Sequence, residues 1–505
     1  MNKHRSLLYL AILATTSGAF AQSKTTSSVA KLPEANIART SVEAHIRFLA
    51  SDELRGRRTG EPGNMVAARY IAEQFRLLGL KPAPNQTDFY QNVPLQVVKP
   101  ASSGSLTLGG TPLEFRKQFL VIAGPPVDLN TETAYIGYGL TDGADGYNGR
   151  DVKGKIVVAQ VGSSDGGTGS GMLTASQQKR RLAAEKGAVA LIELYTSGTM
   201  PWAYVTQMLN SEQLSLAAGG TQTSSLPTIW VDNAKNQLGS LKEAGQKVSL
   251  QTSGRPLTPV NSVNVAGIIE GTDPKLKNEY VMLSAHFDHV GVAKPGSPGY
   301  SESDSIFNGT RDNAMGVAGL LAAAKAFSEQ PPKRSIIIVA LTGEEVGLLG
   351  SRYYAEHPLV PLNQTIFNLN IDNAGYNDTS IVSVIGLDRT GAKADIEAGA
   401  KAFGLSVVGD PAPEQGLFDR SDNVNFAIKG VPAPTFSAGF RTFNEELMKY
   451  YHRVADNPDS IDFNYLLKFC QAYTHAARLI ADRPTRPKWA AGDKYEPAAK
   501  VLYGL

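Results

Sequence analysis

The stretch SIIIVALTGEEVGLLGS, residues 335–351, constrains the fold more than any other part of this chain. Its short run from Ile336 to Ala340 is rich in β-branched residues and is typical of a strand buried on both faces of a parallel sheet. Glu344 and Glu345 follow that strand directly, and neighbouring residues on a turning backbone point in different directions. Such a pair could form an acidic first helical turn. Its position at the carboxyl end of a buried strand, where open α/β sheets bind ligands, favours a functional site instead.

The same alternation of strand, loop and helix continues through the second half of the chain. It predicts strands at residues 264–269, 280–285, 335–341, 366–371, 381–385 and 433–437. It predicts helices at residues 314–328, 347–356, 389–403 and 464–481, and earlier helices at 42–50 and 64–78. This spacing indicates an α/β fold of three layers, with a mostly parallel sheet between two layers of helices.

Residues 113–256 have a different texture, with short β-like runs between Gly/Ser-rich loops such as GSSDGGTGSG. No cluster of His, Asp and Glu with ligand spacing occurs in this stretch. We therefore expect an inserted α+β domain that divides the main domain into residues 41–112 and 257–482. Residues 483–505 are expected to be a docked C-terminal tail.

The first residues, 1–21, have a basic start, an apolar run and a small-x-small cleavage site, which predict a secretory signal peptide. The apolar run is shorter than the ~20 residues that span a bilayer, so no stable membrane anchor is expected. We predict a flexible leader at residues 22–40 and export to the periplasm or the medium. Cys470 is the only cysteine and cannot form an internal disulfide bond.

The charge of the chain argues against a nucleic-acid partner. Lys3 and Arg5 leave with the signal peptide, so 49 basic residues fall to 47 and equal the 47 acidic residues. A balanced charge without basic clusters also gives no reason to expect an anionic membrane as a partner.

Several side chains with catalytic chemistry follow predicted strands or start a helix. In an extended segment residues two apart share a side, so Asp288 could orient the His286 ring, whereas His289 should point away and be structural. Asp312 precedes a glycine-rich helix, where it could also be an N-cap. Further candidates come later in the chain: Asp372 after strand 366–371, and Tyr451 and His452 in a loop. Their shared position at one edge of the sheet favours a common site.

Two histidines and three carboxylates, one of them bridging, form a donor set suited to two zinc ions. Five motifs stand in this order: SAHFDHVG, TRDNAMGVAGLL, TGEEVGLLGS, NIDNAG and YYHRVAD. The series resembles the motifs of the co-catalytic zinc aminopeptidase family, which includes the glutamate carboxypeptidases and, more distantly, the glutaminyl cyclases. The resemblance covers residues 41–100 and 260–482. The inserted stretch resembles a protease-associated (PA) domain through YNGRDVKGKIVVAQVG, KGAVALIEL and LPTIWVD.

The resemblance implies two zinc ions per chain and assigns their ligands. One ion would be held by His286 and Asp372, the other by Glu345 and His452, and Asp312 would bridge the two.

The resemblance also implies the catalytic roles. Glu344 would be the general base, Asp288 would orient His286, and Tyr451 would donate a hydrogen bond to the substrate carbonyl oxygen. A cis peptide bond would follow Asp312. Asn423 stands where many relatives have a histidine, which leaves the metal ligands untouched but removes any expectation about substrate contacts in that loop.

These expectations lead to an exported zinc exopeptidase that hydrolyses peptides, most readily at the amino end. A carboxypeptidase would need a basic pocket for the terminal carboxylate, and the sequence shows no obvious Arg/Lys cluster for one. A glutaminyl cyclase-like acyltransferase would use one zinc ion. A binding protein on an inactive scaffold would have lost ligands, whereas every position is filled here. The PA-like insert could bind a partner or restrict access to the site.

Overall fold

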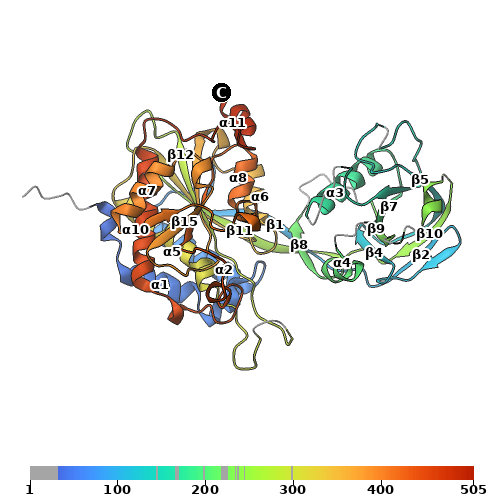
Figure 1. The fold of residues 1–505 in the computed structure, drawn as a ribbon, viewed down its shortest axis with the longest axis horizontal. Helices are drawn as coiled ribbons and strands as arrows, with labels where there is room; N and C mark the ends of the chain where they lie inside the picture. Colours follow the sequence, from blue (N-terminus) through green and yellow to red (C-terminus); the bar gives the residue numbers. More distant parts are fainter. Residues whose placement is uncertain are drawn as a thin grey trace, which may run out of the picture.

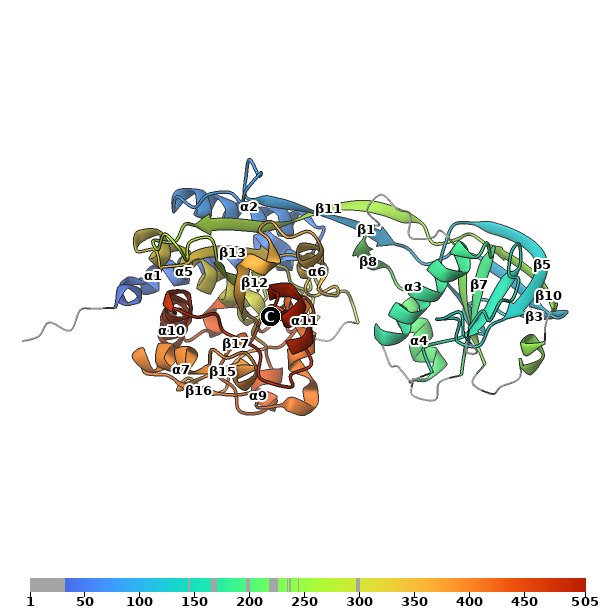
Figure 2. The same cartoon turned by 90° about the horizontal axis from the view of Figure 1, so that it is seen from above.

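The computed structural model describes residues 32–505 except 144–145, 165–169, 197–199, 218–225, 234, 236–237, 244 and 297–299. They form two lobes, each built on one sheet and joined by the long strands β1 and β11 (Figures 1 and 2). The predicted signal peptide, residues 1–21, lies outside the described residues. The described part of the predicted leader is ordered, which corrects that prediction: Pro33–Asn36 form a 3-10 helix. Glu34 is fully buried and contacts His475 and Arg478, so this segment is fixed to the main lobe.

The larger sheet has the strand order β16-β15-β17-β14-β12-β13-β11-β1-β8. Its centre, β13-β12-β14-β17, is parallel, whereas β11, β1 and β8 pair antiparallel at one end and β15 pairs antiparallel with β17. The predicted parallel character therefore holds for the middle of the sheet, where the site lies. The strands are β1 (Tyr90–Val98), β8 (Gln213–Leu216), β11 (Leu257–Ile269), β12 (Tyr280–His286), β13 (Ser335–Leu341), β14 (Thr365–Ile371), β15 (Ile381–Ile385), β16 (Ser406–Val408) and β17 (Thr435–Ala438).

Both faces of this sheet are covered by helices, as strand β13 illustrates. Ile336 and Ile338 pack into the hydrophobic core on one face, and Ile337 and Val339 pack into the core on the other. All seven residues of β13 are buried, as predicted for a strand without a solvent face. The helices are α1 (Arg39–Leu49), α2 (Pro62–Leu77), α5 (Met315–Glu329), α6 (Leu349–Glu356), α7 (Lys393–Ala402), α8 (Asn423–Ile428), α9 (Glu445–Met448), α10 (Phe463–Asp482) and α11 (Glu496–Tyr503). Among the described residues, no helix has the length and apolar character to cross a membrane.

The second lobe has an eight-stranded sheet in the order β3-β2-β10-β5-β6-β7-β9-β4. This sheet begins at Gly104, nine residues before the predicted domain boundary at 113, because β2 pairs with β10. The elements are β2 (Gly104–Leu108), β3 (Thr111–Leu113), β4 (Phe119–Ala123), β5 (Val127–Tyr135), β6 (Ile156–Gln160), α3 (Ser170–Glu185), β7 (Ala190–Tyr195), α4 (Trp202–Leu209), β9 (Thr228–Asp232) and β10 (Lys247–Thr252). The lobe is an α+β unit that lies between β1 and β11 in the chain.

A buried ion pair fixes helix α3 to the sheet of this lobe. Lys179 Nζ lies 2.9 Å from Glu193 Oε1, and both side chains are fully inaccessible to solvent. Glu193 Oε2 also accepts hydrogen bonds from the Ser176 hydroxyl and from Trp230 Nε1, the latter at 2.8 Å. Buried charges are tolerated when they are paired and hydrogen-bonded in this way.

The C-terminal tail packs onto the main lobe, as expected. Trp489 Nε1 donates to the Gly430 carbonyl at 3.0 Å, and the Tyr503 hydroxyl donates to the Thr365 carbonyl at 2.6 Å.

Candidate metal centre

The predicted site residues meet at the carboxyl edge of the parallel strands. Strands β13 and β14 flank β12, and the three end next to His286, the pair Glu344-Glu345 and Asp372. Asp312 lies just before helix α5, and His452 follows helix α9 in a loop. Parallel strands bring their carboxyl ends to one edge, so residues far apart in the sequence converge there.

The first group of possible ligands consists of His286, Asp312 and Asp372. His286 Nε2 lies 3.2 Å from Asp312 Oδ1 and 3.3 Å from Asp372 Oδ1. Their ligand atoms all lie within 4.8 Å of one another, so one ion could contact all three.

The second group shares Asp312 and adds Glu345, His452 and His289. His452 Nε2 lies 3.1 Å from both Asp312 Oδ2 and Glu345 Oε2. Asp312 therefore presents one oxygen to each group, which is the arrangement that a bridging ligand requires. The two groups together contain all five ligands that the resemblance implies.

His289 corrects one prediction, because its side chain does not point away from the site. Its Nδ1 lies 2.7 Å from Glu345 Oε1, and its ring packs edge-on against the His452 ring. The chain leaves the extended conformation after His286, where β12 ends, so the alternation of sides does not continue to residue 289.

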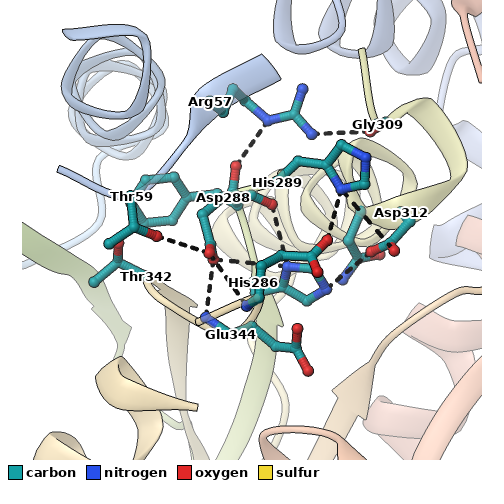
Figure 3. A network of polar contacts seen from close by, with 12 residues as sticks. Arg57, Thr59, His286, Asp288, His289, Gly309, Asp312, Thr342 and Glu344 are labelled. Atoms are coloured by element: carbon teal, nitrogen blue, oxygen red, sulfur yellow. Dashed lines mark hydrogen bonds and ion pairs between the residues drawn. The ribbon is translucent and has the colours of Figure 1, made fainter. Parts of the chain in front are cut away.

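Asp288 lies next to His286, the residue that it is predicted to orient, and it has further contacts. Its Oδ1 is 3.7 Å from His286 Nδ1, whereas its own backbone carbonyl is closer, at 3.3 Å. The carboxylate also accepts the backbone N–H groups of Glu344 at 3.1 Å and Glu345 at 3.3 Å, and the Thr59 hydroxyl at 2.8 Å. Asp288 therefore holds the backbone of the two glutamates, which carries their side chains (Figure 3).

Arg57 is a site component that could not be recognised from the sequence, because it lies between the predicted helices 42–50 and 64–78 and outside the five motifs. Its side chain is buried, and its guanidinium donates to the carbonyls of Leu49, Phe287, Asn308 and Gly309 at 2.5–2.8 Å. Figure 3 shows it between the segment that carries His286 and the segment that leads to Asp312. A planar fork with five donors suits such convergent carbonyls. Three arginines within four residues, at 55, 57 and 58, were the available signal.

A second arginine ties Asp312 to the loop of His452. Arg311 Nη1 lies 2.9 Å from Asp456 Oδ1, and both side chains are buried. Asp456 Oδ2 also accepts the backbone N–H of Arg311 at 2.8 Å and that of Asp312 at 3.4 Å. Because Asp456 is four residues beyond His452, this pair fixes two ligand-bearing segments relative to each other.

The peptide bond between Asp312 and Asn313 is cis, as the resemblance predicts. The Asn313 side chain accepts the Gly316 N–H at 3.1 Å and donates to the Ile371 carbonyl at 2.9 Å. A Cβ at Gly316 would lie 2.4 Å from Asn313 Oδ1, so glycine is needed for this close approach. Asn313 thereby connects the segments of Asp312 and Asp372.

The charges of the site favour bound cations. Burial disfavours a charged His286, but the surrounding carboxylates outweigh it and raise its pKa well above the usual value. Burial likewise opposes a charged His452, yet contacts with Asp312 and Glu345 raise its pKa to about 10. Burial raises the pKa of Glu344 well above its usual value, and the nearby carboxylates of Asp372 and Glu345 add to this rise. This concentration of carboxylates is stabilised by positive charge.

Imidazole nitrogens and carboxylate oxygens are donors that zinc binds readily. The residues present therefore fit metal ions on the chemistry of the donor set and on the convergence of its atoms.

Glu344 is turned differently from Glu345. Its carboxylate forms no hydrogen bond or ion pair with other described residues and lines a cavity together with Asp312, Glu345 and Asp372. Apolar side chains form another part of this cavity: Ala374, Ile385, Leu417, Phe440 and Phe443. The Glu344 side chain is thus available to a water molecule or a substrate in the cavity.

Of the remaining predicted positions, Tyr451 lines the cavity and Asn423 does not. Tyr451 lines the same cavity, and its ring stacks on His452 with 4.2 Å between centroids. Asn423 is buried and donates to the Ala433 carbonyl at 3.1 Å, whereas its neighbours Arg420 and Ser421 line the cavity. The departure at Asn423 is therefore accommodated outside the cavity wall.

A partly parallel sheet between helices, with a histidine–carboxylate centre at its carboxyl edge, defines a domain of the zinc-peptidase class. Comparison with known families agrees with this class. Residues 264–477 match the peptidase family M28.

Individual relatives extend the comparison. Aminopeptidase YwaD of Bacillus subtilis (strain 168) is 25% identical over 416 residues, which are 75% of this chain and 82% of that protein. Vacuolar membrane protease of Saccharomyces cerevisiae is 34% identical over 119 residues, and this match covers only 11% of that protein. The structure of an aminopeptidase from Aneurinibacillus sp. strain AM-1 aligns over 91% of this chain and 98% of that chain, at 22% identity and a TM-score of 0.54. The similarity to the Aneurinibacillus structure is a similarity of fold.

Proposed function

We propose that this chain is an exported aminopeptidase that removes residues from the amino end of peptides with two zinc ions. The observation that carries the proposal is the sharing of Asp312 between two donor groups beside the available carboxylate of Glu344. The similarity to aminopeptidase YwaD supports the same reaction. One ion is assigned to His286 and Asp372, and the other to Glu345 and His452.

The protein side chains supply the acid–base chemistry. Zinc in this centre would lower the pKa of a water molecule and polarise the scissile carbonyl. Glu344 takes a proton from the attacking water onto its carboxylate and then gives it to the leaving amine. The Tyr451 hydroxyl donates a hydrogen bond to the carbonyl oxygen as negative charge develops there. Asp372, in the same cavity, neutralises the α-amine of the substrate.

A panel of chromogenic substrates tests the proposal. Aminoacyl-p-nitroanilides should be hydrolysed, N-acylated analogues should not, and a chelator should abolish the activity. Elemental analysis of active protein should find two zinc ions per chain. One ion or none in active protein would overturn the two-zinc assignment, and one ion would agree with a cyclase-like centre instead.

A carboxypeptidase is the second candidate, because the structure contains basic side chains that the sequence did not reveal as a cluster. Arg58, Lys294 and Arg453 line a cavity next to Tyr451 and His452. Hydrolysis of N-acylated peptides with a free carboxyl terminus would favour this alternative.

Export and the role of the insert are also proposals. Amino-terminal sequencing of protein recovered from the periplasm or the medium should give Gln22 as the first residue. We propose two roles for the PA-like lobe: it restricts access to the site, or it binds a partner. Comparing the cleavage of short and long peptides tests the first role.

A further inference from the structure

A second cavity adjoins the metal centre on the other side of Tyr451 and His452. Its volume is about 610 Å³, which lies in the range of small-molecule sites. Tyr451 and His452 line this cavity as well as the first one, so the second cavity borders the metal centre at these two residues. The remaining lining residues are Arg58, Val290, Val292, Ala293, Lys294, Phe307, Met448 and Arg453.

The two cavities carry opposite charge. Four carboxylates and one arginine, Arg420, line the first cavity. Two arginines and a lysine line the second, and none of its lining residues is acidic. Under the proposed function, the first cavity takes the amino-terminal residue of the substrate, with its ammonium group near Asp372. The second cavity then takes the leaving part of the peptide.

The second cavity has a cation available next to the centre. Among the residues that the structure describes, the Arg453 guanidinium has no hydrogen-bonding or ionic partner, although the side chain is only partly exposed. Arg58 lies 4.0 Å from Glu61, at the limit for an ion pair, and both side chains are about half exposed. Such a pair contributes little, so Arg58 can turn to another anion.

The apolar lining of the second cavity favours the binding of an anion by these arginines. Val292, Ala293 and Phe307 form part of the wall, and a lower local polarity strengthens a charge-assisted hydrogen bond. Arg453 follows His452 directly, so their Cα atoms are ~3.8 Å apart, and one extended residue spans ~3.5 Å. Under the proposed function, this wall therefore lies beside a metal ligand, where the first or second leaving residue would lie.

Resting on the proposed function, we infer that the second cavity selects a carboxylate on the leaving side of the substrate. Preferred substrates are then short zwitterionic peptides, whose ammonium group lies in the acidic cavity and whose carboxylate lies in the basic one. The carboxylate can be the carboxyl terminus of a dipeptide or tripeptide, or an acidic side chain after the scissile bond. Arginine suits this recognition because its planar fork binds carboxylates with two parallel hydrogen bonds.

The first experiment uses the zinc-loaded full chain and matched substrates. The first pair is leucyl-alanine and leucyl-alaninamide, which lacks the terminal charge. The second pair is leucyl-aspartamide and leucyl-asparaginamide, which lacks the side-chain charge. We expect kcat/KM to be about tenfold higher for the charged member of at least one pair, equivalent to about 1.4 kcal/mol. The pair that shows the preference identifies the source of the carboxylate. Added salt should reduce the ratio, because exposed charges are screened. Ratios near one in both pairs would overturn the inference.

The second experiment uses Arg453→Gln and Arg58→Gln, with Arg352→Gln as a control on the exposed surface of α6. We expect each cavity variant to reduce the preference for the charged substrate severalfold and the control to keep it. Unchanged ratios in both cavity variants would overturn the assignment to this cavity. The wild-type ratios remain decisive if a variant does not fold.

Two further substrates separate the inference from the proposed function. Leucyl-p-nitroanilide has no carboxylate, so its hydrolysis together with equal acid and amide rates would refute the inference alone. Cleavage of N-acetyl-leucyl-alanine without cleavage of leucyl-p-nitroanilide or the amides would refute the aminopeptidase function and support carboxylate recognition. Cleavage of none of these compounds would refute both.

Discussion

Replacing Arg57 by lysine should loosen the metal centre although it keeps the charge. The guanidinium donates to four buried carbonyls, and two of them, at Phe287 and Gly309, belong to segments that carry His286 and Asp312. Lysine has three donors on one nitrogen and cannot reach four carbonyls around a planar fork. At least one buried carbonyl loses its partner, which costs about 1–3 kcal/mol of folding stability.

The same change should weaken metal binding, because residues that orient ligands typically contribute 10–100-fold to metal affinity or activity. The assay titrates zinc into metal-free Arg57→Lys protein and measures kcat/KM with an aminoacyl-p-nitroanilide at each zinc concentration. Arg55→Lys is the matched control, since Arg55 lies two residues earlier and is exposed. If Arg57→Lys kept wild-type zinc affinity and activity within about twofold, Arg57 would not be a positioning residue.

Three further predictions follow from the centre and the insert. Glu344→Gln should retain zinc and lose about 10²–10⁴-fold in kcat, because an amide cannot accept the proton, whereas Glu345→Gln should lose zinc in elemental analysis; the opposite pattern would reverse the two roles. Removing zinc with a chelator should lower the thermal unfolding midpoint, and adding zinc back should restore it. The reason is that a ligand at 1,000 times its Kd stabilises the folded chain by about 4 kcal/mol. An unchanged midpoint would contradict a site formed only in the folded chain. Glu193→Gln should destabilise the insert by about 3–5 kcal/mol, because Lys179 keeps a buried charge without its partner. Denaturant unfolding followed by Trp230 fluorescence should detect this loss. A loss below about 1 kcal/mol would refute the prediction.

Hydrophobic pattern was sufficient to predict the central strands of the main lobe. Strand β13 covers residues 335–341 as predicted, and β15 covers 381–385, because β-branched runs bounded by turn residues mark buried strands clearly. Helix starts were less accurate: the helix expected from residue 347 begins at Leu349. The sequence pattern does not specify the turn that Glu344 and Glu345 form before it.

The contacts that Arg57, Asp288 and His289 form around the metal centre could not be predicted from local sequence patterns. Arg57 acts through backbone carbonyls, which leave no trace in the sequence, and Asp288 binds N–H groups that lie 56 and 57 positions away. His289 was placed wrongly because strand geometry was extended past the end of β12. Contacts of this kind depend on how the loops pack, and only the folded chain reveals them.

Strand β8 has a consequence for attempts to isolate the main lobe. It comes from the inserted stretch, yet it pairs with residues 95–98 of β1 and forms the last strand of the larger sheet. Excising the insert would leave β1 as an open edge carrying Leu95 and Val97, with unsatisfied backbone groups that can pair with another chain. A shortened protein would therefore tend to aggregate through this edge, so any trimmed version needs to keep residues 213–216 or replace them with a charged strand.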